Sequence, residues 1–143
     1  SISMTDCYTE DAVWQSIASP PRADAAAGSA PRGGGGGTAP VVGRKGLEEW
    51  ITNEWRTRER LLAMGHYRIH SLMEPDIVLD GDRATSRSYF QTTDNDNGRI
   101  YTVSIGIYKD VFVRSADGRW RMKERLLLRQ GAVAPAAAPA GPR

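Results

Sequence analysis

Residues 89–108 read YFQTTDNDNGRIYTVSIGIY, and this stretch decides the fold. Two runs rich in β-branched and aromatic residues flank the dipeptide Asn97-Gly98. Asn-Gly pairs adopt the positive φ angles that a two-residue hairpin turn requires. The stretch therefore predicts a β-hairpin whose strands continue well beyond the turn.

Similar turn signals lie on both sides of this hairpin, Asp80-Gly81 before it and Asp117-Gly118 after it. The three turns separate four strand-like runs: Tyr67–Leu79, Arg83–Thr93, Arg99–Arg114 and Arg119–Arg129. Four long strands joined by hairpins form an antiparallel meander, and the run Ala12–Ile17 predicts one shorter strand.

One helix is predicted over Gly43–Leu62, where Leu47, Trp50 and Trp55 recur near the helical period and define one apolar stripe. We therefore expect an α+β fold in which a curved antiparallel sheet packs on helices. Only a short stub precedes Asp11, so an N-terminal helix is expected to be short or missing.

The 143 residues suit one domain, and 40% hydrophobic with 25% charged residues is ordinary for a globular protein. We assign residues 1–130 to this domain. Within it, residues 19–43 are rich in Gly, Pro and Ala and predict a disordered insertion. Residues 131–143 are rich in Ala and Pro and predict a disordered tail.

Charge and cysteine content argue against several classes of partner. A formal net charge of +2, with acidic and basic residues interleaved, does not favour nucleic acid. No apolar run approaches the roughly 20 residues that span a bilayer, so no membrane partner is expected. The single cysteine, Cys7, predicts a reducing, cytoplasmic location.

The turns also predict which residues face each other across the sheet. Counting outward from them places both His70 and Ser104 opposite Gln91, and Arg125 opposite Asp110. This register divides the sheet into a polar face and an apolar face, and we expect helices to cover the apolar one. The apolar face carries Ile69, Met73, Ile77, Leu79, Ala84, Phe90, Val103, Ile105, Ile107, Val111, Val113, Trp120, Met122, Leu126 and Leu128, and the polar face carries His70, Arg87, Tyr89, Gln91, Ser104, Tyr108, Asp110, Lys123, Arg125 and Arg129.

Pro75 leaves a second register open. A proline cannot donate to the hydrogen-bond ladder of a sheet, so the run Tyr67–Leu79 needs a bulge or an edge position there. A bulge would shift the pairing by one residue and move His70 to the apolar side, inside a cavity beneath the helix.

His70 is the best candidate for proton transfer, because its ordinary pKa of about 6.5 lets it gain or lose a proton at neutral pH. A structural histidine bonded to Gln91 is the alternative. Tyr89, Tyr108 and Ser104 are candidate hydrogen-bond partners for a substrate oxygen, or else ordinary residues of a sheet surface.

Trp14 and Trp50 are candidate apolar contacts for a substrate, although core packing is the commoner role of tryptophan. Asp110 and Arg125 are expected to form a cross-strand ion pair with a structural role.

A metal site is not expected. His66 and His70 are four residues apart, about 13 Å along a strand, which is too far for one metal ion. No cofactor of another kind is expected either.

Four segments resemble the SnoaL-like branch of the nuclear transport factor 2-like superfamily. DCYTEDAVW (6–14) resembles its acidic pair and first strand, and VGRKGLEEWI (42–51) the start of its next helix. HSLMEPDIVLDGDRATSRSYF (70–90) resembles its histidine strand, Asp-Gly-Asp turn and next strand, and GIYKDVFVRSADGRWRMKERLL (106–127) its last hairpin.

The resemblance implies a cone-shaped α+β barrel around a deep, mostly apolar pocket. Similar folds occur in scytalone dehydratase, bile-acid dehydratases, polyketide cyclases, steroid isomerases and the small subunits of ring-hydroxylating dioxygenases. In the dehydratases the histidine that matches His70 lines the pocket and moves protons, which favours the bulged register. The chain departs from the family at Glu74, where asparagine is usual, and before Asp11, where those enzymes carry further helices.

Two hypotheses about function follow. In the first, the protein is a cofactor-independent lyase or isomerase, and His70 abstracts a proton from a hydrophobic ring compound of polyketide or steroid type. In the second, it is a non-catalytic ligand-binding module or oligomeric subunit, like the dioxygenase small subunits. The polar, arginine-rich sheet face favours assembly in either case, as a homodimer or higher homo-oligomer.

Overall fold

The computed structural model describes residues 4–18 and 39–130. Along the chain it contains η1 (Met4–Cys7), β1 (Tyr8–Ala18), β2 (Val41–Val42), α1 (Gly43–Ala63), β3 (His66–Leu72), β4 (Asp76–Asp80), β5 (Arg83–Asp96), β6 (Arg99–Arg114) and β7 (Trp120–Gln130). The tail and most of the insertion that we predict to be disordered lie outside the described residues. The last residues of that predicted insertion are an exception, because they form β2 and begin α1.

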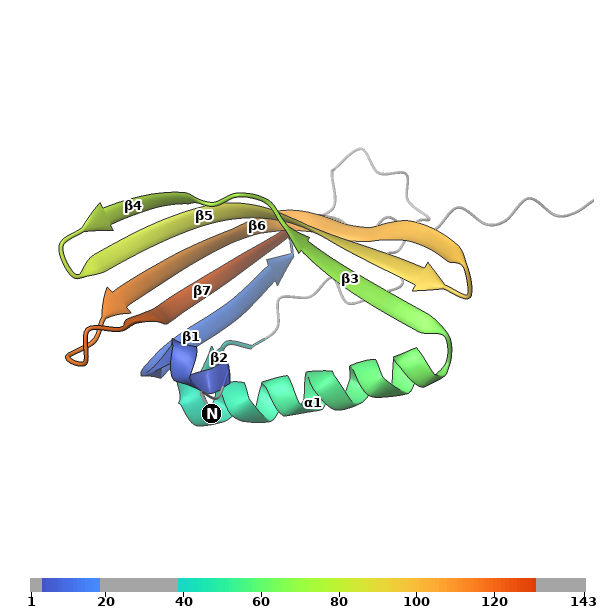
Figure 1. Cartoon of the computed structure of the whole chain (residues 1–143), viewed down its shortest axis with the longest axis horizontal. Helices are drawn as coiled ribbons and strands as arrows, with labels where there is room; N and C mark the ends of the chain where they lie inside the picture. The colour runs from blue at the N-terminus through green and yellow to red at the C-terminus, as the bar shows by residue number, and fades with distance from the viewer. Residues whose placement is uncertain (1–3, 19–38, 131–143) are drawn as a thin grey trace, which may run out of the picture.

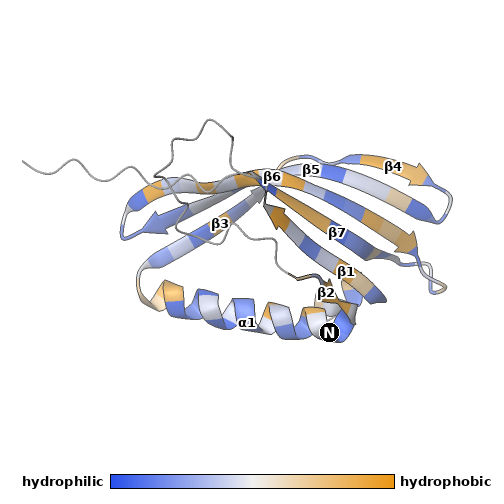
Figure 2. Ribbon diagram, turned by 180° about the vertical axis from the view of Figure 1, so that it is seen from behind, coloured by the Kyte–Doolittle hydropathy of each residue, from blue (hydrophilic) through white to orange (hydrophobic). Residues whose placement is uncertain are grey.

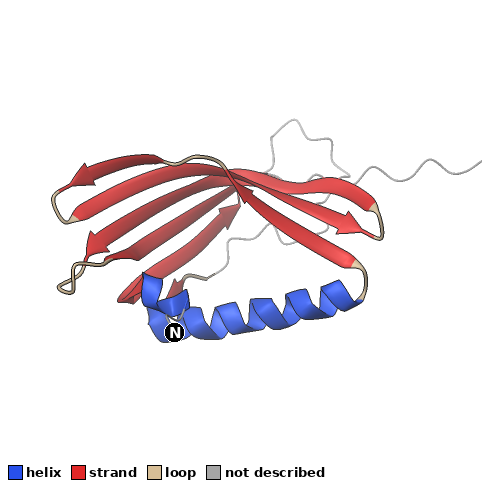
Figure 3. Ribbon diagram, in the orientation of Figure 1, coloured by secondary structure: helices blue, strands red, loops and turns tan. Residues whose placement is uncertain are grey.

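The strands form one curved, unclosed sheet of seven strands, and α1 runs along its concave side (Figures 1 and 3). The strand order is β2-β1-β7-β6-β5-β3, and β4 also pairs with β5. The predicted α+β architecture is therefore confirmed. The expectation of a purely antiparallel sheet is wrong, because β1 lies parallel to β7, which makes the sheet mixed.

Local turn chemistry produces the central hairpin as predicted. Asn97 and Gly98 have φ angles of 50° and 92°, and Asp96 pairs with Arg99 across them. Pro75 lies between β3 and β4, so the predicted strand Tyr67–Leu79 is interrupted where no backbone N–H is available.

Two irregularities shift the predicted pairing by one residue. β3 pairs with β5 so that His70 lies opposite Thr92 rather than Gln91. A bulge between the Thr92 and Thr93 pairs places Phe90, and not Tyr89, opposite Gly106. Because neighbouring residues of a strand point to opposite faces, each shift moves a whole set of side chains to the other face.

The helix therefore covers a different set of side chains from the one we predicted. On its side Tyr108 is 6% exposed and Asp110 is 4% exposed, although both belong to the predicted polar face. Ile69 and Ile105 belong to the predicted covered face and are 51% and 48% exposed on the outer side. Hydrophobic residues along β4, β6 and β7 are visible in Figure 2, and no helix of residues 4–18 and 39–130 covers the outer side of the sheet.

The buried core is small and lies between α1 and the sheet. Phe90, Tyr108 and Leu127 form its centre, and Trp14 packs against them. Trp14 also holds the helix to the sheet, since its ring lies 4.4 Å from that of Trp50 on α1.

Candidate functional site

A cavity of about 880 Å³ separates the concave side of the sheet from α1. Its apolar wall comes mainly from the helix and β1, and includes Trp14, Trp50, Ile51, Trp55, Leu61 and Leu62. Its polar wall comes from the sheet, and includes His70, Thr92, Ser104, Tyr108, Arg125 and Arg129. The helix wall also contains Glu54, Thr57, Arg58 and Glu59, so charged groups lie on both sides of the cavity. A cleft with apolar walls and a few convergent polar groups is the usual form of a small-molecule site.

His70 and Tyr108 form the centre of the polar wall. The Tyr108 hydroxyl lies 3.1 Å from His70 Nε2, within hydrogen-bond distance, and the two rings stack at 5.8 Å. Phe90 lies between their strands, with its ring 5.0 Å from His70 and 4.9 Å from Tyr108. The three rings therefore hold one another in place.

Gly106 makes this arrangement possible. A Cβ atom at this position would lie 2.2 Å from the Leu128 carbonyl oxygen and 2.5 Å from Cε1 of Phe90. Any side chain there would push the Phe90 ring away from the sheet and disturb the rings that rest on it. The missing side chain is therefore a requirement of the site.

Burial and charge keep the histidine neutral. Partial burial, followed by the guanidinium groups of Arg58 and Arg125, lowers the pKa of His70 below its ordinary value of 6.5. Burial raises the pKa of Tyr108 above 10.0. At neutral pH the imidazole is therefore an unprotonated base beside an intact phenol, which is the combination needed to accept a proton and to donate a hydrogen bond.

A buried ion pair packs against the ring of Tyr108. Arg125 donates two hydrogen bonds to Asp110, of 2.9 Å and 2.7 Å, and its guanidinium carbon lies 4.3 Å from the centroid of the Tyr108 ring. The Asp110 side chain is only 3% exposed. The pair is therefore more deeply enclosed than an ordinary surface ion pair.

Sequence reasoning missed a second polar cluster at the far end of the cavity. Arg68 donates two hydrogen bonds to Asp94, of 2.6 Å and 2.7 Å, and His66 Nε2 lies 3.0 Å from the same carboxylate. The bond from Arg68 lowers the pKa of Asp94. The predicted strand Arg83–Thr93 ends just before Asp94, whereas β5 continues to Asp96 and Asp94 is 2% exposed.

The remaining predicted site residues divide between the two faces. Ser104 lines the cavity and is 7% exposed. Trp14 and Trp50 stack together in the cavity wall. Tyr89 lies on the outer face, 47% exposed, where Arg87 donates a hydrogen bond of 2.8 Å to its hydroxyl. His70 pairs with Thr92 rather than with Gln91, so it shares a face with Phe90 and not with Tyr89.

The structure gives no cluster that resembles a metal centre within residues 4–18 and 39–130, since no three His, Cys, Asp or Glu side chains gather there. Across the same ranges, no helix has the length and apolar character needed to cross a membrane.

Solved structures of low sequence identity share this fold. ActVI-ORFA from Streptomyces coelicolor is 17% identical, with a TM-score of 0.59 over 87% of this chain and 79% of that chain. The β subunit of the benzoate 1,2-dioxygenase from Burkholderia mallei is 18% identical, with a TM-score of 0.59 over 87% and 74%. A protein from Catenulispora acidiphila in complex with S-DNPA is 19% identical, with a TM-score of 0.58 over 87% and 75%.

At these identities the likeness shows the fold alone. No curated protein matches the sequence significantly. The sequence does match the SnoaL-like domain over residues 3–126, which is most of its length. Most of the described residues that build the curved sheet, α1 and the cavity between them lie in this range. The chain belongs to the SnoaL-like domain family.

Proposed function

We propose that the protein is a cofactor-independent lyase or isomerase that moves a proton on a hydrophobic ring compound. One observation carries the proposal: His70 lies at hydrogen-bond distance from Tyr108 in the wall of the cavity between α1 and the sheet. This pair provides a base and a hydrogen-bond donor at adjacent positions, and the proposed reaction uses neither a metal ion nor another cofactor.

In the proposed reaction, His70 takes a proton from a carbon next to a carbonyl group, and the electron pair of the broken C–H bond moves onto the carbonyl oxygen. The negative charge that develops on the substrate oxygen is stabilised by a hydrogen bond from Tyr108 or Ser104. His70 then returns the proton, either to another carbon of the same molecule or to a hydroxyl group that leaves as water. The first outcome is an isomerisation and the second is a dehydration.

The aromatic walls support a ring compound as the substrate. Trp14 and Trp50 line one side of the cavity, and the stacked rings of His70 and Tyr108 line the other. Flat apolar surfaces favour flat apolar ligands, because stacking adds to the hydrophobic gain. The volume of about 880 Å³ suits a molecule of two or three fused rings.

Hydrogen exchange tests the proposal without knowledge of the natural substrate. Tetralone, a bicyclic ketone, has acidic hydrogens next to its carbonyl, and their replacement in D₂O is followed by NMR. We expect the protein to accelerate this exchange and His70→Gln to abolish the acceleration. Tyr108→Phe should slow it by about 10²-fold. Exchange at the native rate in His70→Gln would refute the proposal.

Tyr89→Phe is the matched control, because it removes the same hydroxyl group from the outer face of the sheet. We expect it to exchange tetralone at the native rate. A loss equal to that of Tyr108→Phe would show that the effect is not specific to the cavity.

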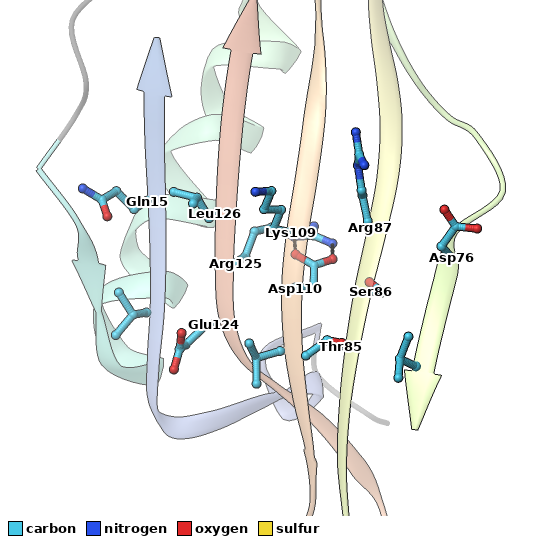
Figure 4. A pocket seen from close by; sticks show the side chains of 13 residues that line it. Gln15, Asp76, Thr85, Ser86, Arg87, Lys109, Asp110, Glu124, Arg125 and Leu126 are labelled. Carbon is cyan, nitrogen blue, oxygen red and sulfur yellow. Dashed lines mark hydrogen bonds and ion pairs between the residues drawn. The ribbon is translucent and has the colours of Figure 1, made fainter. Parts of the chain in front are cut away.

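An oligomeric subunit without catalysis is the second candidate function, and the outer face of the sheet favours it. This face exposes apolar residues in the single chain, among them Ile69, Val78, Tyr89 and Ile105. It also contains a groove of about 690 Å³, shown in Figure 4 with α1 behind the sheet. Basic residues of the groove, Arg87 and Lys109, lie between the acidic Asp76 and Glu124 (Figure 4).

Such a face suits a second copy of the chain, since opposite charges on one surface are matched after a twofold rotation. We propose a homodimer through this face, in which the cavity of each copy stays open. Light scattering of the native protein should give the dimer mass, and Ile105→Asp should give the monomer mass. A monomeric native protein would contradict the dimer.

The two candidate functions differ in their dependence on His70. A subunit role predicts that His70→Gln assembles normally and that the native protein exchanges tetralone no faster than buffer. The enzyme predicts acceleration by the native protein. A cytoplasmic location remains a prediction from the cysteine content of the sequence.

A further inference from the structure

Three arginines project from the sheet into the cavity, and two of them are neutralised by the chain itself. Arg68 is bound by Asp94 and Arg125 by Asp110, each through two hydrogen bonds to a carboxylate that is almost fully buried. This is the arrangement expected for a guanidinium that binds a buried carboxylate.

Arg129 is the exception. It lines the cavity from β7, yet no carboxylate of the described residues forms an ion pair with it. Its Nε atom is enclosed and has no hydrogen-bond acceptor within the described chain. Buried polar atoms of native proteins almost always have a partner, so an acceptor from outside the chain is the simplest explanation.

The sheet places Arg129 in line with the proposed catalytic pair. Arg129 pairs with Gly106, and Gly106 pairs with Phe90, whose ring contacts His70. Arg129 and His70 line the same cavity, so a ring compound bound there would have one end at the guanidinium and its face near the imidazole.

From this arrangement we infer that the cavity binds ring compounds that carry a carboxylate, with Arg129 as the partner of the carboxylate. The inference deepens the proposed function and rests on it for the role of His70. A carboxylate fits a guanidinium better than a single oxygen does, because it accepts two parallel hydrogen bonds. Arg58, on the helix wall, adds a second positive charge on the opposite side, although Glu54 and Glu59 lie on the same helix.

Binding of two matched probes tests the inference. Naphthoate and naphthamide have the same shape, and only naphthoate is charged. We expect naphthoate to bind the native protein about tenfold or more tightly by calorimetry, as charge-assisted hydrogen bonds allow. Arg129→Gln should remove this preference and leave naphthamide binding unchanged, whereas Arg129→Lys should retain part of it. Arg83→Gln, on a strand end far from the cavity wall, is the control and should keep the native preference.

The His70 signal in NMR gives a second readout. Arg129 is among the charges that lower the pKa of His70, together with Arg58, Arg125 and Arg68. Bound naphthoate should therefore raise the pKa of His70, because its charge offsets that of Arg129, and naphthamide should not. Without a ligand, Arg129→Gln should also raise this pKa.

Equal affinity of the native protein for both probes would overturn the inference, as would absence of naphthoate binding or an unchanged preference in Arg129→Gln. None of these results affects the tetralone assay. If His70→Gln fails to reduce exchange while Arg129 still selects naphthoate, the catalytic proposal is wrong and the binding site remains.

Discussion

Replacing Asp110 with asparagine should destabilise the fold by about 3 kcal/mol. The native carboxylate is 3% exposed and accepts hydrogen bonds of 2.9 Å and 2.7 Å from Arg125. Asparagine keeps the shape but loses the charge and one acceptor, which leaves the guanidinium unpaired. Breaking a buried pair in this way costs about 3–5 kcal/mol. The lower end applies because the Arg125 side chain is still 21% exposed and keeps some contact with water.

Urea unfolding followed by tryptophan fluorescence measures this loss, since Trp14 and Trp50 stack at the edge of the same core. A loss of this size should lower the melting temperature by roughly 10 °C. Glu10→Gln is the matched control, because Glu10 pairs with Arg44 at 2.7 Å but its side chain is 79% exposed. It should cost less than about 1 kcal/mol. If Asp110→Asn costs no more than Glu10→Gln, the ion pair is not enclosed as described.

Two further outcomes are expected. Gly106→Ala should cost about 2 kcal/mol or more in thermal unfolding, because its new methyl group would overlap backbone and ring atoms. Gly46→Ala, on a helix with its nearest contact at 3.5 Å, is the control and should be neutral or stabilising. Equal effects of the two substitutions would contradict the packing described around Gly106. The stability of the folded chain should fall as the pH decreases from about 6.5 toward the lowered pKa of His70, because the unfolded chain takes up the proton first. Urea titrations at several pH values should show a smaller loss of stability for His70→Gln than for the native protein. Identical pH profiles for the two proteins would refute the assignment of this effect to His70.

Local chemistry made much of the fold predictable. The positive φ angles of Asn97 and Gly98 follow from the residue types, and so does the break at Pro75. Pro75 also raised the alternative in which His70 moves beneath the helix, and the structure places the histidine there. These features depend on a few neighbouring residues, which a sequence displays directly.

The bulge in β6 could not be predicted in the same way. Val103 and its neighbours alternate between apolar and polar side chains, and this pattern reads equally well with or without an extra residue. One undetected residue was enough to assign Tyr89 to the same face as Ser104 and Tyr108. The link from Arg68 to Asp94 joins residues 26 positions apart, so no local pattern marked it.

Which face of the sheet is covered depends on how many helices pack against it. Ile105 and Ile107 form an apolar row, which predicts that a helix covers their face of the sheet. The described residues contain one long helix, and the contact of Trp14 with Trp50 holds that helix on the opposite face. Which side is covered is decided by contacts between distant elements, and hydropathy along one strand does not contain that information.

The space between α1 and the sheet also affects the thermodynamics of the folded state. In most small domains apolar side chains fill the interior, whereas here Trp55 and Leu62 remain more than half exposed beside the cavity. A ligand that fills the cavity covers this surface and becomes part of the core. At a concentration 100 times its dissociation constant, such a ligand would add about 2.7 kcal/mol to the stability of the folded chain. Ligand screening by melting temperature should therefore detect compounds that fill this cavity.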